Sequence, residues 1–155
     1  MLAEQPSAIQ GVRIVELKQI VDERGAVLHM LRRDSDLFTS FGEIYFSQVN
    51  QGVVKAWKRH RQATQHLAAP VGRVRLVIYD DRDDSSTKGH VEEIVLGRPD
   101  HYKLVRVPPR LWYGFQGIAD QPSLLANCTD LAHDPNESEA VSPADNRIPF
   151  QWQAV

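Results

Sequence analysis

Residues 52–72, GVVKAWKRHRQATQHLAAPVG, form the most informative stretch of the sequence. Its first nine residues are rich in β-branched and aromatic side chains, which is typical of a strand. Side chains two apart on a strand point to the same face, so Lys58 and His60 are expected on one face. A hairpin after His60 would bring Gln65 beside them. The sequence therefore predicts a cluster of these three polar side chains.

Short runs of the same kind fill the rest of the chain, with polar, Gly- and Pro-containing breaks between them. No long amphipathic helix is visible. This pattern predicts an all-β, antiparallel sandwich or barrel in one domain over residues 1–155, with residues 1–10 as a flexible N-terminus or a dimer arm. The runs are 11–21, 26–33, 43–50, 52–60, 71–81, 90–97, 102–107, 110–118 and 122–129.

Composition excludes several classes of protein. The 155 residues carry 18 Lys and Arg against 20 Asp and Glu, and a net charge of −2 argues against broad nucleic-acid binding. The N-terminal MLAEQPSAIQ lacks a signal-peptide pattern, and no run approaches the ~20 apolar residues of a membrane span. The single cysteine, Cys128, cannot form an internal disulfide, which fits a reducing compartment. We therefore expect a cytoplasmic protein without membrane or nucleic-acid partners.

The spacing from Gly52 to Gly72 matches the first motif of the cupins, G-x5-H-x-H-x3-4-E-x6-G. Metal cupins place two His and one Glu where this chain has Lys58, His60 and Gln65, and a further His where it has Tyr113. A lysine ammonium has no lone pair for a metal, and one imidazole does not hold a divalent ion. The resemblance therefore implies a cupin barrel (a jelly roll, or double-stranded β-helix) without a metal or another cofactor.

Further blocks resemble the dTDP-4-dehydrorhamnose 3,5-epimerase family over roughly residues 12–152. DERG at 22–25 fits D-x-R-G, and GVVKAW at 52–57 stands for GVLRGL. DDRDDSSTKG at 80–89 fits D-x-R-x-x-S-x-T-x-G, and PPRLWYGF at 108–115 stands for P-x-G-x-x-H-G-F. Asp145, Ile148 and Trp152 resemble the closing D…I…W pattern. The order of the blocks is that of the family.

The resemblance implies a dimeric barrel that binds a thymidine-diphosphate 4-keto sugar. Protons beside the ketone, at C3 and C5, are removed and returned on the opposite face. This chemistry needs a base near each C–H bond, a donor for the enolate oxygen and an acid on the far face. The family uses a His after GVLRGL as base and a Tyr near Y-x-P as acid, and a carboxylate from a further C-terminal segment orients the His.

This chain departs from the family at each of those places. Lys58 occupies the position of the family's base, and Tyr113 occupies the position of a second lumen histidine. His133 occupies the position of the tyrosine that acts as the acid. The chain ends at Val155, before the segment that is expected to supply the orienting carboxylate. Three interpretations follow. In the first, catalysis is rebuilt, with Lys58 as base or enolate clamp and His60, Tyr113 and His133 as candidate partners.

In the second interpretation, the barrel binds a nucleotide sugar or another anion but does not catalyse a reaction on it. Arg24, Lys55 and Arg75 would then grip a pyrophosphate, because guanidinium groups suit phosphate oxygens. Gln65 completes this predicted set of substrate-binding residues. In the third, the protein is a dimeric structural or interaction module whose lumen is filled by side chains. The first interpretation predicts an enzyme, and the other two predict none.

Overall fold

The computed structural model describes residues 3–155, within which the chain forms strands and no helix. None of the elements described there is a helix long and apolar enough to cross a membrane. The strands are β1 (Glu4–Gln5), β2 (Arg13–Glu16), β3 (Gln19–Asp22), β4 (Gly25–Leu28), β5 (Glu43–Val49), β6 (Val54–His60), β7 (Gln65–Val71), β8 (Arg73–Tyr79), β9 (Val91–Gly97), β10 (Lys103–Val107), β11 (Trp112–Gly117), β12 (Ser123–Thr129) and β13 (Ser138–Ala140).

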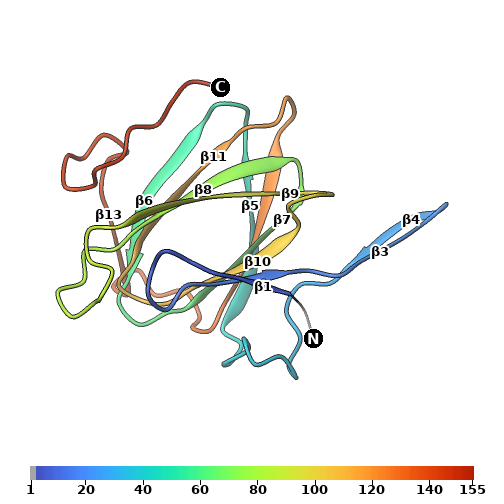
Figure 1. Ribbon diagram of the computed structural model, residues 1–155, viewed down its shortest axis with the longest axis horizontal. Helices are drawn as coiled ribbons and strands as arrows, with labels where there is room; N and C mark the ends of the chain where they lie inside the picture. The colour runs from blue at the N-terminus through green and yellow to red at the C-terminus, as the bar shows by residue number, and fades with distance from the viewer. Residues whose placement is uncertain (1–2) are drawn as a thin grey trace.

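Two antiparallel sheets form the body of the molecule (Figure 1). One runs in the order β1-β2-β10-β7-β12-β5, and the other in the order β13-β6-β11-β8-β9. Alternate side chains of both sheets point inward and make one hydrophobic core, to which Leu67 and Val105 contribute from the first sheet and Leu76 and Phe115 from the second. The predicted all-β jelly roll is therefore confirmed.

A second apolar cluster covers the outer face of the β6-β11-β8 sheet. Trp57 and Trp112 point outward there and pack against Ile148, and Trp152 lies against the same cluster. The C-terminal segment thus crosses the back of the sheet and seals it. Ile148 and Trp152 of the closing D…I…W pattern belong to this cover, so they stabilise the barrel from outside the lumen.

Strand β7 lies between β10 and β12, although the sequence runs did not include residues 65–70. Its centre is Ala-Ala-Pro, which favours strands poorly, but Ala68 and Ala69 are fully buried beneath neighbouring strands. Gly72 then turns the chain with φ +74°, where a Cβ would meet Ser123 at 2.2 Å. Tertiary packing, more than local propensity, makes this segment a strand.

Residues 3–10, which we expected to be flexible or to form a dimer arm, pack on the barrel in part. Glu4 and Gln5 pair with β2, and Ile9 is buried in the core. Met1 and Leu2 lie outside the described residues. A further segment, the β3–β4 hairpin, projects from the body (Figure 1).

Candidate active site

A bulge in β6 aims two lysines into the lumen. Lys58 lies opposite Tyr113 on β11, but Lys55 lies opposite Phe115, so three residues of β6 span two of β11. On a regular strand, residues three apart would point to opposite faces, and the extra residue cancels that alternation. Lys55 and Lys58 therefore both line the interior, as Tyr113 and Phe115 do.

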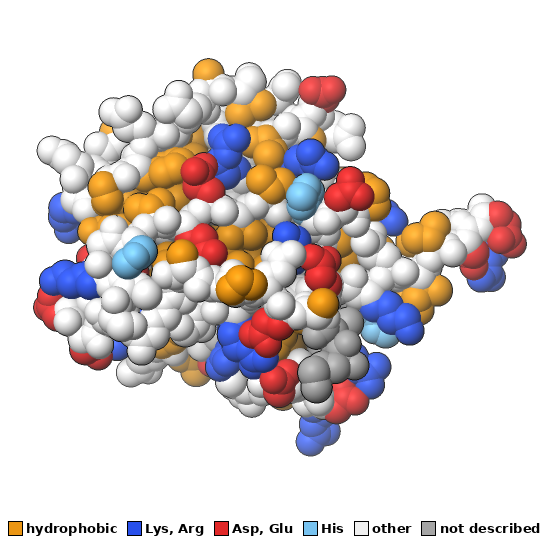
Figure 2. Space-filling view, in the orientation of Figure 1, with side chains coloured by type: hydrophobic (Ala, Val, Ile, Leu, Met, Phe, Trp, Pro, Cys, Tyr) orange, Lys and Arg blue, Asp and Glu red, His pale blue; other side chains and the backbone are white. Residues whose placement is uncertain are grey.

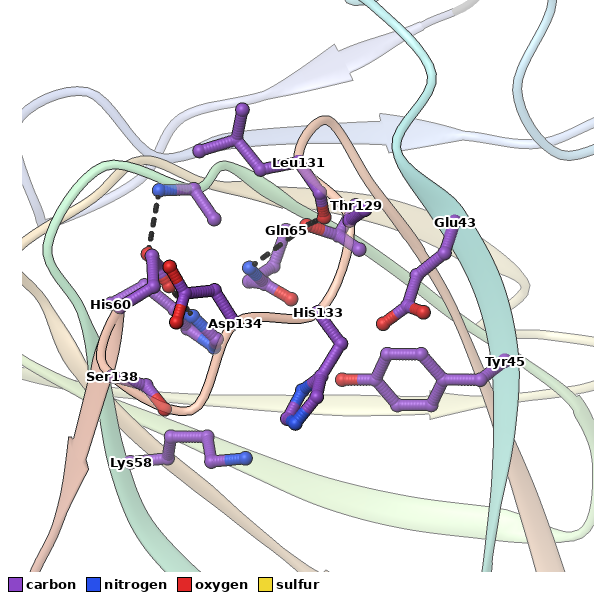
Figure 3. Close-up of a pocket in the computed structure, with 13 residues that line it drawn as sticks. Glu43, Tyr45, Lys58, His60, Gln65, Thr129, Leu131, His133, Asp134 and Ser138 are labelled. Atoms are coloured by element: carbon purple, nitrogen blue, oxygen red, sulfur yellow. Dashed lines mark hydrogen bonds and ion pairs between the residues drawn. The ribbon is translucent and has the colours of Figure 1, made fainter.

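Two adjoining pockets open between the sheets at this point. The larger, about 480 Å³, is closed on one side by the loop from Leu131 to Glu137 (Figure 3). The smaller, about 280 Å³, lies deeper along β6 and β11. Tyr45 and Lys58 line both pockets, which join them into one site. Volumes of this size suit small-molecule ligands.

His60 lies in the larger pocket and is held by a carboxylate. Its Nδ1 is 2.8 Å from Oε2 of Glu137, and both side chains are nearly buried. The other oxygen of Glu137 accepts the backbone N–H groups of Gln62 and Ala63, at 3.1 and 2.8 Å. Glu137 therefore has a fixed position, and as an anion it orders the Nδ1–H tautomer of His60. That tautomer leaves Nε2 free of a proton.

Electrostatics keep this pair ready to accept a proton. Burial lowers the pKa of His60 below its ordinary 6.5, and Lys58 lowers it further, while Glu137 opposes both. Burial alone would raise the pKa of Glu137, but hydrogen bonds from His60, Ala63 and Gln62 outweigh it and the pKa falls. At neutral pH the pair is thus a neutral imidazole beside a carboxylate, the state that a general base requires.

Lys58 provides the positive charge of the site. Its ammonium makes no hydrogen bond or ion pair within residues 3–155, and Figure 3 shows the side chain directed across the pocket toward His133 and Tyr45. Among the residues that the structure describes, no carboxylate forms an ion pair with Lys58, contrary to what a filled structural lumen would require. A cation with free N–H donors at this point can receive an anionic oxygen.

A chain of hydrogen bonds crosses the floor of the site. Nε2 of His60 is 3.3 Å from the Tyr113 hydroxyl, and the Tyr113 and Tyr45 hydroxyls lie near enough that each shifts the pKa of the other. The Tyr45 oxygen accepts Nδ2–H of Asn127 at 2.8 Å, and Asn127 also donates to Gln65 at 2.5 Å. The chain links the β6 wall to the β5 wall.

The structure gathers most of the candidates predicted from the sequence. Lys58, His60, Gln65 and His133 line the larger pocket, and Lys55 and Tyr113 line the smaller one. Their roles in catalysis or binding stay predictions. His133 lies on the exposed loop after β12, whereas Gln65 is buried in the floor.

Two predicted phosphate ligands lie away from both pockets of this chain. Arg24 is at the tip of the β3–β4 hairpin and pairs with Asp22. Arg75 faces outward on β8, where it donates to Gln116 and approaches Glu93, because its neighbours Val74 and Leu76 take the inward positions. Substrate contact by these two arginines stays a prediction that this chain alone does not provide.

Sequence reasoning missed Glu137, Tyr45 and Asn127. Glu137 was overlooked because the family resemblance implied a carboxylate from a further C-terminal segment, whereas the structure places a carboxylate of the loop before β13 against His60. The signal was an acidic residue just after Asp134-Pro135. Glu43, Tyr45 and Ser47 share one face of the edge strand β5. This spacing could have indicated that the Tyr45 side chain points into the barrel. No group of three or more His, Cys, Asp or Glu residues that could hold a metal ion occurs across 3–155.

Comparison with known proteins identifies the family of the chain. The model of the dTDP-4-dehydrorhamnose 3,5-epimerase family matches residues 6–155. The chain belongs to this family. The probable low-salt glycan biosynthesis epimerase Agl13 of Haloferax volcanii is 38% identical over 144 residues, 92% of this chain and 88% of that protein. The spore coat polysaccharide biosynthesis protein SpsL of Bacillus subtilis is 28% identical over 147 residues, 95% of this chain and 93% of that protein.

Among solved structures, the crystal structure of a dTDP sugar isomerase from Desulfovibrio desulfuricans is 49% identical to this epimerase-family chain. It superposes with a TM-score of 0.92 and covers 98% of this chain and 95% of that one. Family and relatives thus confirm the predicted class, a nucleotide-sugar epimerase with a jelly-roll barrel.

Proposed function

We propose that this epimerase-family protein inverts a carbon beside the ketone of a dTDP-4-keto-6-deoxyhexose, with His60 as the base. The observation that carries the assignment is the pair of His60 and Glu137 in the wall of the larger pocket, with Nδ1 and Oε2 2.8 Å apart. The family's base position holds Lys58, so the imidazole has moved two residues along β6 and kept its face of the strand.

In the first step, Nε2 of His60 takes the proton from the carbon beside the ketone. The electron pair of the broken C–H bond moves to the ketone oxygen and gives an enolate. Glu137 stabilises the imidazolium that forms, as a buried carboxylate does for a catalytic histidine. The long 3.3 Å contact between Nε2 and Tyr113 is weak enough to be exchanged for the substrate C–H group.

Lys58 is proposed as the clamp for the enolate oxygen. Its ammonium is free within the described residues and lies on the same face of β6 as His60. Removal of a single donor to a developing oxyanion costs about 10²–10³ in rate, which is the size of the contribution expected of Lys58. A base role for Lys58 is disfavoured because no carboxylate or imidazole described in residues 3–155 forms a hydrogen bond or ion pair with its ammonium.

Lys55 is proposed to contact the diphosphate. Its Nζ donates to the backbone oxygen of Gln48 at 2.6 Å and to Ser47 at 3.1 Å, at the edge of the smaller pocket. An ammonium has three N–H donors, so one remains for a phosphate oxygen. Gln65 would act from the floor, where it fixes Asn127.

The protein is further proposed to act as a homodimer. The β3–β4 hairpin carries the exposed apolar side chains Ile20, Val21 and Val27, and Figure 2 shows hydrophobic groups along this arm with charged groups at its tip. An isolated two-stranded hairpin is marginally stable in water, so a second copy that covers it is favoured. The edge strand β5 offers a matching apolar surface with Ile44 and Phe46.

In such a dimer, Arg24 at the hairpin tip of one subunit could reach the pocket of the other. The predicted phosphate contact of Arg24 depends on this arrangement. Light scattering of the wild type and of Val21→Asp tests it, because a buried charge at the interface should yield monomers. A cytoplasmic location is proposed from the buried, free thiol of Cys128, and cell fractionation tests that point.

The test of the function is proton NMR of a dTDP-4-keto-6-deoxyhexose with the purified protein in deuterium oxide. Loss of the C3 or C5 proton signal together with appearance of an epimer is the expected result. Failure to exchange any proton of several 4-keto nucleotide sugars, by protein that binds dTDP, would contradict the proposal.

A further inference from the structure

We infer that Tyr45 is the acid that returns the proton from the face opposite His60, and that Tyr113 is a buried link which resets the two groups. This inference rests on the proposed epimerase function. Inversion needs a proton donor across the ring from the base, and the loop residue His133 holds the place predicted for it. The geometry points instead to β5.

Tyr45 stands on the opposite wall from His60. It belongs to β5 of the first sheet, whereas His60 belongs to β6 of the second, and both side chains line the larger pocket. Figure 3 shows the Tyr45 ring directed into the pocket, with its hydroxyl facing Lys58 and His133. Its side chain is partly open to solvent, with 38% of the residue exposed, so a sugar can reach the hydroxyl. A ring held between these two walls meets a base on one face and a phenol on the other.

The hydroxyl of Tyr45 is positioned and protonated. Asn127 donates to its oxygen at 2.8 Å, and Asn127 is itself fixed by Gln65 at 2.5 Å. Because its oxygen accepts this bond, the O–H of Tyr45 remains available for the pocket. Burial raises the pKa of Tyr45, although the hydrogen bond from Asn127 and the nearby Tyr113 hydroxyl oppose the rise. The same two groups would stabilise the phenolate left after proton transfer.

Tyr113 then relays a proton that restores His60 and Tyr45 to their starting states. The substrate C–H bond breaks toward Nε2 of His60, and a new C–H bond forms on the other face with the proton of Tyr45. This leaves an imidazolium and a phenolate. The imidazolium N–H passes its proton to the Tyr113 oxygen 3.3 Å away, and Tyr113 passes its own proton to Tyr45. Both groups return to their starting states, with no net gain or loss of protons.

Tyr113 fits a link better than a direct acid. It is 6% exposed, lies beneath the larger pocket and borders only the smaller one among the pockets described. Burial raises the pKa of Tyr113 far above its ordinary value, with Tyr45 and Glu137 adding to the rise. The group therefore does not keep a negative charge, and gains one proton as it gives another.

His133 carries less support for the role of acid. It lies on the exposed loop between β12 and β13, and no side-chain hydrogen bond positions it among residues 3–155. An acid must be held within hydrogen-bond reach of the carbon that it protonates. The loop histidine would have to be fixed by the substrate itself, whereas Tyr45 is already fixed by the protein.

The test measures two activities of the Tyr45→Phe variant separately: exchange of the substrate proton with solvent deuterium, and formation of the epimer. Without the acid, His60 still removes the proton and returns deuterium to the same face, so the substrate proton should exchange in deuterium oxide. Formation of the epimer should fall by about 10²-fold or more. The matched control is Tyr79→Phe, because Tyr79 lies on the outer face of β8 beside the Trp57 cluster. This variant should both exchange the substrate proton and form the epimer.

Normal inversion by Tyr45→Phe would overturn the inference, and so would loss of both exchange and inversion by a folded Tyr45→Phe. The inference would also fail if His133→Ala, and not Tyr45→Phe, exchanged the substrate proton without forming the epimer. Tyr45→Leu provides a second variant if the Phe protein melts well below the control. Failure of the proposed function has a different signature, because the wild-type protein itself would then neither exchange nor invert.

Discussion

The carboxylate of Glu137 faces Nδ1 of His60 at 2.8 Å, while its second oxygen caps the turn that follows β6. One loop residue thus orients the imidazole and fixes the turn between β6 and β7. An imidazole of β6 and a carboxylate of the loop before β13 are therefore paired within residues 3–155.

Glu137→Gln should lower kcat by roughly 10²-fold, because the amide no longer stabilises the imidazolium or enforces the Nδ1–H tautomer. KM should change little. The matched control is Glu139→Gln, two residues along, whose carboxylate pairs with Arg59 outside the pocket. Equal losses in the two variants would show that the effect is structural and would contradict the account.

Activity should fall with decreasing pH through an acid limb below about 6.5, because protonation of His60 removes the base and burial holds its pKa below that value. Lys58→Met removes a cation that lowers this pKa, so the limb should move to higher pH. Glu137→Gln removes a group that raises it, so the limb should move to lower pH. The pH profiles of kcat/KM measure both shifts, and shifts of the same sign would refute the electrostatic assignment.

Lys55→Ala should weaken binding of dTDP by about 10- to 150-fold, because one charged hydrogen bond contributes roughly 1.5–3 kcal/mol. Exchange at saturating substrate should be nearly unchanged. Lys88→Ala, an exposed lysine paired with Asp83 on a distant loop, serves as the control. Calorimetric titration with dTDP checks the affinity, and an unchanged Kd would remove Lys55 from the binding site.

Asp80→Asn should cost about 3 kcal/mol of unfolding free energy. Asp80 is fully buried and accepts hydrogen bonds from Arg82, Ser85 and Thr87, which hold its pKa far below the usual range in spite of burial. The asparagine would leave the guanidinium of Arg82 without its charge partner. Asp83→Asn, at an exposed position in the same loop, should have a small effect in denaturant titration. Equal stability of the two variants would contradict this reading of the D-x-R-x-x-S-x-T-x-G block.

Much of the fold could be predicted because alternation and turn residues are local signals. The runs at 43–50 and 122–129, for example, become β5 and β12 nearly residue for residue. Strand β7 was missed because its Ala-Ala-Pro centre is stabilised by burial between two other strands. Its character is set by partners that are distant in the sequence.

The site could be predicted only in part, for a similar reason. His60 and Lys58 follow from their two-residue spacing, but Lys55 joins them through a bulge that no local pattern indicates. Glu137 and Tyr45 reach the pocket from a loop and an edge strand 77 residues after and 15 residues before His60. Only the closed barrel brings these groups together.

The most direct test of the central claim compares deuterium exchange by His60→Asn and Lys58→Met on the same 4-keto nucleotide sugar. Both variants should be folded, as shown by thermal melts, and should bind dTDP. His60→Asn should lose exchange at the carbon beside the ketone, whereas Lys58→Met should still exchange this proton, roughly 10²-fold more slowly. Exchange that persists without His60 and disappears without Lys58 would make the lysine the base and contradict the account.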